Sequence, residues 1–112
     1  MRAGGGEPSV LVRSRVTRAR ERALERNGVL NGAIPSGRFD ECAPLAPAAH
    51  DQLRTELELG RLSGRGLHRI RRVARTIADL ADDPSALVEA EHVALALQFR
   101  VTVGASLRRS AA

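Results

Sequence analysis

Residues 63–81 read SGRGLHRIRRVARTIADLA, and this stretch decides the fold. At 100° per residue its apolar side chains fall within one arc of about 160°. They are Leu67, Ile70, Val73, Ala74, Ile77, Ala78, Leu80 and Ala81. The other side of the helical wheel carries Arg65, His68, Arg69, Arg71, Arg72, Arg75, Thr76 and Asp79. With Ser63 as its N-cap, the stretch predicts one amphipathic helix, whose apolar face is buried and whose polar face is exposed to solvent.

Three further helices are predicted around it, over residues 10–26, 46–60 and 89–99, because apolar residues recur there at helical spacing. The first presents Val12, Val16, Ala19 and Ala23. The second presents Leu53, Leu57, Ala49 and His50. The third carries Val93, Leu95, Ala96, Leu97 and Phe99. No β pattern extends beyond a few residues, so we expect an all-α, small four-helix bundle.

The remaining segments are expected to connect or flank this bundle. Residues 28–44 form a connector whose apolar residues should pack onto the domain, with one short helical turn from Phe39 to Cys42. We expect the helical domain to span residues 9–101. The Gly-rich residues 1–8 are predicted to be a disordered lead-in, and residues 102–112 a disordered tail.

The composition excludes several kinds of chemistry. The formal net charge is +5, and all 18 basic residues are Arg. Without Lys, neither a Schiff base nor a phosphate-binding loop ending in Gly-Lys-Ser/Thr can form. The single Cys42 and three scattered His residues give no metal-ligand spacing and fit a reducing cytoplasm. No apolar run is long enough for a membrane span. We therefore expect no catalytic residue, no metal site and no cofactor of its own.

Residues 61–75 form a basic stripe that contains six Arg and no acidic residue. These are Arg61, Arg65, Arg69, Arg71, Arg72 and Arg75. Arg65 lies in the first helical turn, where backbone N–H groups and the helix dipole favour an anion, and Gly64 and Gly66 flank it. The spacing suits the terminal phosphate of a nucleotide or a nucleic-acid phosphate. The alternative is a solvated helix face with no ligand.

Residues 62–80 resemble the C-terminal signature of the magnesium-chelatase-like proteins of the ComM/YifB type. That signature begins Leu-Ser-x-Arg, continues with an aromatic residue and His-Arg, and ends Arg-Val-Ala-Arg-Thr-Ile-Ala-Asp-Leu. Leu67 stands here in place of the aromatic residue. Residues 15–31 and 91–100 are also similar to the family, and the resemblance covers about residues 12–100.

The resemblance implies the lid of an AAA+ ATPase that processes DNA. Arg65 then matches, by position, the sensor-2 arginine that contacts the γ-phosphate of ATP, and Arg69 is a second candidate. The family's Walker A and Walker B motifs are missing, so we expect a truncated or split member that does not hydrolyse ATP alone. ATP and Mg²⁺ would come only with an AAA+ core, in cis or in trans, and DNA is a further partner.

The alternative function is a free-standing basic helical protein that binds nucleic acid through Arg–phosphate contacts. An autonomous enzyme is the least favoured interpretation.

Overall fold

The computed structural model describes residues 9–81 and 87–111, with side chains described as far as Arg100. The elements in this part of the chain are α1 (Ser9–Asn27), η1 (Asn31–Ala33), η2 (Ser36–Arg38), α2 (Phe39–Cys42), α3 (Pro47–Glu58), α4 (Gly64–Leu80) and α5 (Ala90–Ala111). The fold is all-α, as predicted. Within the described ranges the only strand-like pairing is an isolated bridge between Leu45 and Val88.

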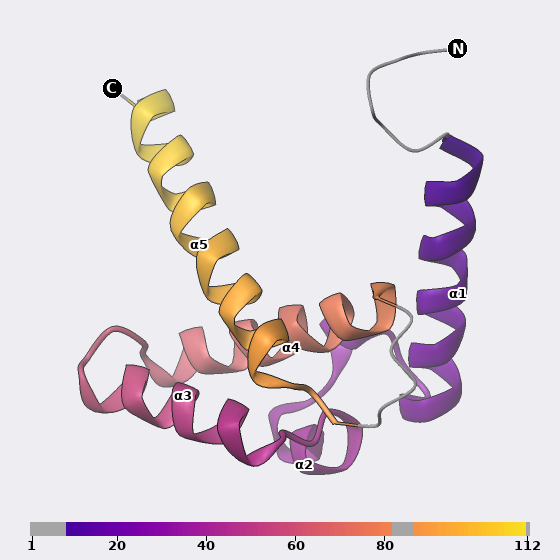
Figure 1. Ribbon diagram of the computed structural model, residues 1–112, viewed down its shortest axis with the longest axis horizontal. Helices are drawn as coiled ribbons and strands as arrows, with labels where there is room; N and C mark the ends of the chain where they lie inside the picture. Colours follow the sequence, from indigo (N-terminus) through magenta and orange to yellow (C-terminus); the bar gives the residue numbers. More distant parts are fainter. Residues whose placement is uncertain (1–8, 82–86, 112) are drawn as a thin grey trace.

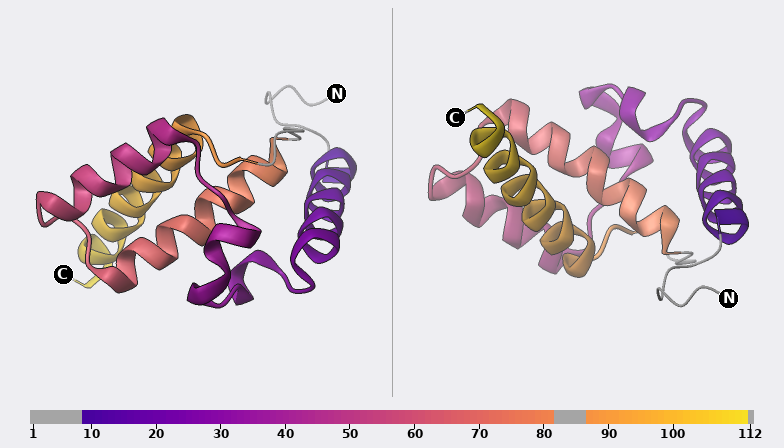
Figure 2. Two further views of the ribbon diagram at one scale, coloured as in Figure 1. Left: turned by 90° about the horizontal axis from the view of Figure 1, so that it is seen from below. Right: turned by 90° about the horizontal axis from the view of Figure 1, so that it is seen from above.

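Helix α4 is the centre of the bundle. Helices α1, α3 and α5 and the turn η1 all pack against it, and α3 also packs against α5. Figure 1 shows α3 below α4, while α1 and α5 rise from α4 on the same side and stand apart at their upper ends. The views from below and above confirm that α1 lies at one end of α4 and that α5 crosses it nearer the other (Figure 2). Helix α4, which the sequence predicts over residues 63–81, is therefore the element against which the other helices pack.

Local signals in the sequence set the ends of these helices. The hydroxyl of Ser63 accepts a hydrogen bond from the backbone N–H of Gly66 at 3.0 Å, so Ser63 is the predicted N-cap of α4. Gly28 and Gly60 follow α1 and α3 with φ of 78° and 74°. Glycine adopts this left-handed conformation without the Cβ clash of other residues, and this explains why both helices end there.

The core lies between α4, α3, α5 and the connector. Ile34 and Phe39 of the connector are buried, as predicted, together with Cys42 of α2. The rest of the core cluster comes from small and branched aliphatic residues: Ala43, Ala49, Leu53, Leu62, Ile70, Ala74, Val88, Val93 and Ala96. With only two aromatic residues in the chain, Ala contacts let the helices approach closely and compensate for the lack of large side chains.

Several predicted core positions are instead exposed. On α1 only Ala19 and Ala23 of the predicted stripe are buried, because the N-terminal half of this helix extends past α4. On α3, Leu57 and His50 are exposed, since the helix buries only Ala49 and Leu53. On α5, Leu95 and Phe99 are also exposed.

Helix α5 is longer than the predicted helix over residues 89–99. It continues to Ala111 through most of residues 102–112, which we expected to be a disordered tail. No proline interrupts this segment, and its one glycine, Gly104, costs a helix only about 1 kcal/mol relative to alanine. The predicted lead-in, residues 1–8, lies outside the described residues.

Replacement of the buried core residue Ile70 tests the phase of α4. Ile70 is 2% exposed, so Ile70→Ala should lower the free energy of unfolding by about 2–5 kcal/mol. Urea denaturation followed by circular dichroism measures this change. Leu59→Ala is the control, because Leu59 is 59% exposed and should lose less than about 0.5 kcal/mol. Equal effects of the two substitutions would contradict the helix phase.

Candidate nucleotide-phosphate site

The N-terminus of α4 presents an open backbone surface. Ser63 caps the helix, and Gly64 and Gly66 lie on either side of Arg65. A side chain added at Gly64 would meet no atom within 4 Å, so the space in front of the first turn is open. The first-turn N–H groups of a helix lack intrahelical partners and carry the positive end of its dipole. This end of α4 can therefore accept an anion at its backbone.

Arg65 and Arg69 project from the first two turns of α4 and are both exposed. Neither side chain makes a hydrogen bond or ion pair with a described residue. They are four residues apart and therefore lie on one face of the helix. The structure thus leaves the two predicted phosphate-binding arginines available to a ligand.

Two more arginines approach the same end of α4 from other elements. Arg61, in the loop after α3, is exposed and pairs with the Glu56 carboxylate at 3.4 Å. Arg100 of α5 donates a hydrogen bond to the backbone carbonyl of Arg61 at 3.1 Å. Arg100 belongs to the segment that resembles the family, but no spacing rule connects it to Arg61 because they are 39 residues apart.

Arg71 and Arg72 do not belong to the solvated face on which they were predicted. Arg71 donates to the carbonyl of Ala43 at 2.9 Å, and Arg72 donates twice to the carbonyl of Ile34, at 3.2 and 2.9 Å. Both guanidinium groups also lie over the ring of Phe39, at 4.9 and 5.3 Å from its centroid. Burial lowers the pKa of Arg71, and the nearby Asp40 only partly opposes this effect. These two arginines hold the connector to α4.

Arg75 and Asp79 are the clearest departure from the predicted exposed face. They are 1% and 3% exposed and form an ion pair of 3.2 Å within one turn of α4. The helical wheel placed them in solvent because it treats one helix at a time. The second half of α4 is covered by α1 and η1 on its polar side as well as by the core on its apolar side, so these charges become buried.

The partners of Asp79 come from α1 and the following turn. Arg26 binds both carboxylate oxygens of Asp79 through separate nitrogens, at 3.0 and 2.9 Å. The side-chain amide of Asn31 donates to the same carboxylate at 2.9 Å and to the hydroxyl of Thr76 at 3.2 Å. Hydrogen-bonded partners on several sides are what a buried charge requires. The set joins α1, η1 and α4 through side chains.

The pKa of Asp79 reflects this environment. Burial by itself would raise the pKa, because it disfavours the charged carboxylate. Hydrogen bonds from Arg26 and Asn31, together with the positive charges of Arg75 and Arg26, favour the carboxylate and outweigh the burial. The pKa of Asp79 therefore lies below its ordinary value of 3.8.

Two histidines, His68 and His92, and the cysteine make contacts within the fold, whereas His50 is exposed. His92 is buried, and its Nδ1 accepts a hydrogen bond from the backbone N–H of Glu89 at 3.0 Å. The ring of His68 lies 5.4 Å from that of Phe39. Cys42 is fully buried. Among the residues described, no three His, Cys, Asp or Glu side chains gather as metal ligands, and no helix is long and apolar enough to cross a membrane.

The sequence model of the family described as "Magnesium chelatase, subunit ChlI C-terminal" matches residues 6–100. The chain belongs to this family. No solved structure shows significant similarity to it.

Three longer proteins are similar to this chain over most of its length. An uncharacterised protein of Mycobacterium tuberculosis H37Rv is 39% identical over 108 residues, which cover 89% of this chain and 20% of that protein. The competence protein ComM of Haemophilus influenzae is 36% identical over 88% of this chain and 19% of its own length. The uncharacterised protein YifB of Escherichia coli K12 is 36% identical over 85% of this chain and 18% of its own length. The chain thus spans about a fifth of each relative.

The buried Asp79 carboxylate should dominate the stability of the α1–α4 contact. Asp79→Asn should lower the free energy of unfolding by about 3–5 kcal/mol near neutral pH, because the buried Arg75 and the partly buried Arg26 lose their counter-charge. The folded-state pKa lies below 3.8, so this stabilisation is present above pH 3.8 and is lost as the pH falls through the folded-state pKa. Urea denaturation of both proteins across this range measures the difference, which should shrink in acid.

The matched control is Asp51→Asn on the surface of α3. Asp51 pairs with Arg54 at 3.2 Å, but both side chains are exposed, so the loss should stay within about 1 kcal/mol. A difference between the unaltered protein and Asp79→Asn that stays constant into acid would show that the charge of Asp79 is not what stabilises the contact.

Proposed function

We propose that this chain is a non-catalytic lid module of a magnesium-chelatase-like AAA+ ATPase. When docked on an ATPase core, it would bring Arg65 to the terminal phosphate of bound ATP. The observation that carries the proposal is the division of arginines along α4. Arg71, Arg72 and Arg75 are occupied within the fold, whereas Arg65 and Arg69 remain exposed at the open end of the helix.

Arg65 would act on ATP as a fixed positive charge. Its guanidinium stays protonated and matches the geometry of phosphate oxygens, so it would stabilise the charge on the transferring phosphoryl group. The first-turn N–H groups of α4 would add hydrogen bonds to the same phosphate. Arg69, one turn further along, is suited either to a second phosphate contact or to the contact with the core.

The rest of the chemistry would come from the core. This chain contains no Lys, so it offers no Walker A lysine, and ATP and Mg²⁺ would be held by the core. In the relatives about four fifths of the length lies outside the part that this chain matches. We propose that such a core is supplied in cis or in trans, in the cytoplasm. One relative is the competence protein ComM, and on this likeness we propose that the docked ATPase processes DNA.

Removal of the Arg65 guanidinium tests this function. Arg65→Ala should leave the helicity and the unfolding midpoint unchanged, because the side chain is exposed and has no described partner. It should lower the ATP turnover of a core docked with this chain by about 10²–10³, as for other donors that stabilise developing charge. A coupled phosphate-release assay measures the turnover.

Arg54→Ala is the control for this test. Arg54 is also an exposed arginine, but it lies on α3 in a surface pair with Asp51, so its loss should leave turnover within about twofold. Equal turnover by Arg65→Ala and the unaltered chain would contradict the proposed role of Arg65.

A second candidate function is binding of nucleic acid through α1. The exposed N-terminal half of this helix, residues 9–18, contains no acidic residue, and its exposed basic residues include Arg13 and Arg18. Arginines that project from an exposed helix surface can reach phosphates of a duplex. This surface is separate from the N-terminus of α4, so the two candidate functions can be tested independently.

Salt dependence distinguishes this second function. We expect the chain to bind duplex DNA at low salt with an affinity that falls as salt rises. The double variant Arg13→Ala, Arg18→Ala should reduce the slope of log K against log salt by about 2, which corresponds to two lost phosphate contacts. Fluorescence anisotropy measures the slope. Binding that is absent, or a slope that the double variant shares with the unaltered chain, would exclude α1 as the contact.

A further inference from the structure

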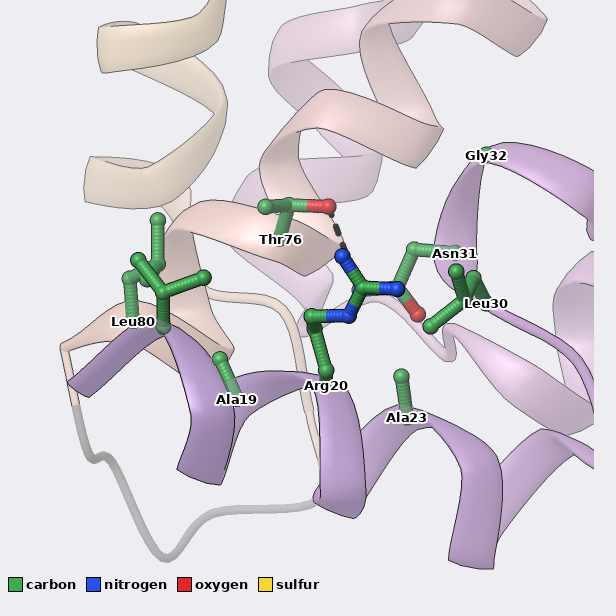
Figure 3. A pocket seen from close by; sticks show the side chains of 9 residues that line it. Ala19, Arg20, Ala23, Leu30, Asn31, Gly32, Thr76 and Leu80 are labelled. Carbon is green, nitrogen blue, oxygen red and sulfur yellow. Dashed lines mark hydrogen bonds between the residues drawn. The ribbon is translucent and has the colours of Figure 1, made fainter. Parts of the chain in front are cut away.

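An apolar surface runs across α1, α4 and α5 on the side from which α1 and α5 rise. A groove of about 640 Å³ lies between α4 and α5, and a hollow of about 210 Å³ lies between α1, the turn η1 and α4. Both are lined by Thr76 and Leu80, so they adjoin. Figure 3 shows the hollow beside α1, with Ala19 near Leu80 and Ala23 near Leu30 and Asn31. We call the combined surface the trough; its main apolar residues are Val16, Val73, Ile77, Leu80, Leu95 and Phe99.

The walls of the trough carry apolar side chains that the described residues do not cover. Phe99 is 60% exposed and Leu95 is 52% exposed, although Phe99 is one of only two aromatic residues in the chain. On the facing wall, Val16 continues the same stripe of α1 that is buried at Ala19 and Ala23. An apolar stripe that is buried at one end and exposed at the other indicates a missing partner.

The charge around the trough indicates what kind of partner fits. None of the residues that line it is acidic. Arg20 lines the hollow and extends from α1 towards Asn31 and Thr76 (Figure 3). A second copy of the chain would bring another formal charge of +5, so like charges oppose self-association. An apolar partner with acidic flanks would instead be attracted.

We propose that the trough binds an amphipathic helix that has acidic residues beside its apolar face. This helix would belong to the ATPase core, which corresponds to the portion of the longer relatives that this chain does not match. A helix is about 10 Å across and inserts its apolar face into grooves lined by other helices. The relatives carry about four fifths of their length beyond the match, which is ample to supply one. This inference rests on the proposed docking to a core and adds the surface through which docking occurs.

A binding experiment in trans tests the trough. The probe is the Mycobacterium tuberculosis relative expressed without the portion that this chain matches, with its fold verified by its binding of ATP. The double variant Leu95→Glu, Phe99→Glu should weaken binding of the probe by at least about tenfold, as expected for apolar anchors at an interface. Arg20→Glu should also weaken it, because the charge at the rim is reversed. Biolayer interferometry measures the dissociation constants.

Leu24→Glu and Leu59→Glu are the matched controls. Both positions are exposed leucines outside the trough, so these variants should bind the probe within about twofold of the unaltered chain. All the substituted side chains are exposed, and circular dichroism should show the same helicity for each variant.

The outcomes separate this inference from the proposed function. If the unaltered chain binds the probe and the trough variants bind equally well, the trough is not the docking surface. The proposed function as a lid that docks on an ATPase core would then be unaffected. If the unaltered chain does not bind the probe, both are overturned. Sedimentation of the unaltered chain as a dimer that Phe99→Glu dissociates would place a second copy in the trough and overturn the proposal. Unchanged binding by Arg20→Glu would contradict the inference that the bound helix carries acidic residues beside its apolar face.

Discussion

The buried carboxylate of Asp79 is the constraint on which the arrangement of the helices depends. It accepts hydrogen bonds from Arg26 of α1 and Asn31 of η1, and it pairs with Arg75 one turn earlier on α4. A buried carboxylate needs all of these partners, so α1 and the following turn are held at one position along α4. Arg22 strengthens the contact by donating to the Asp79 backbone carbonyl at 3.0 Å. The apolar face of α1 is too short to do this alone, since only Ala19 and Ala23 of it are buried.

This anchor also explains how α4 divides its arginines. Where α1 and the connector cover the helix, the arginines bind carbonyls, an aromatic ring or Asp79 and become part of the fold. In the first two turns the polar side of α4 is left uncovered at Arg65 and Arg69, and both stay exposed. Packing, and not the spacing of the sequence, thus determines which arginines can bind a ligand. The same anchor places α1 opposite α5 and so forms the two walls of the trough.

Much of the fold could be predicted from the sequence because its signals are local. The 3.6-residue periodicity predicts α4, Ser63 predicts its cap, and Gly28 and Gly60 predict where α1 and α3 end. The exposure of Arg65 could also be predicted, as it lies before the helix meets its neighbours. The burial of Arg75 and Asp79 could not, because a helical wheel of one helix does not show that α1 and η1 also cover the polar side of α4. The long reach from Arg26 to Asp79, 53 residues apart, leaves no periodic signal. The exposure of Phe99 could not be predicted either, because helical periodicity predicts an apolar face without showing which of its residues another element covers.

Amide hydrogen exchange of the first turn of α4 tests the central claim most directly. The backbone N–H groups of Gly64 and Arg65 have no intrahelical acceptor and should exchange rapidly in the isolated chain. If α4 points at the terminal phosphate, these amides should become protected when the chain is docked on an ATPase core loaded with a non-hydrolysable ATP analogue, and less so with ADP. Protection that is the same with the analogue, with ADP and without nucleotide would contradict the claim that this helix end contacts the phosphate.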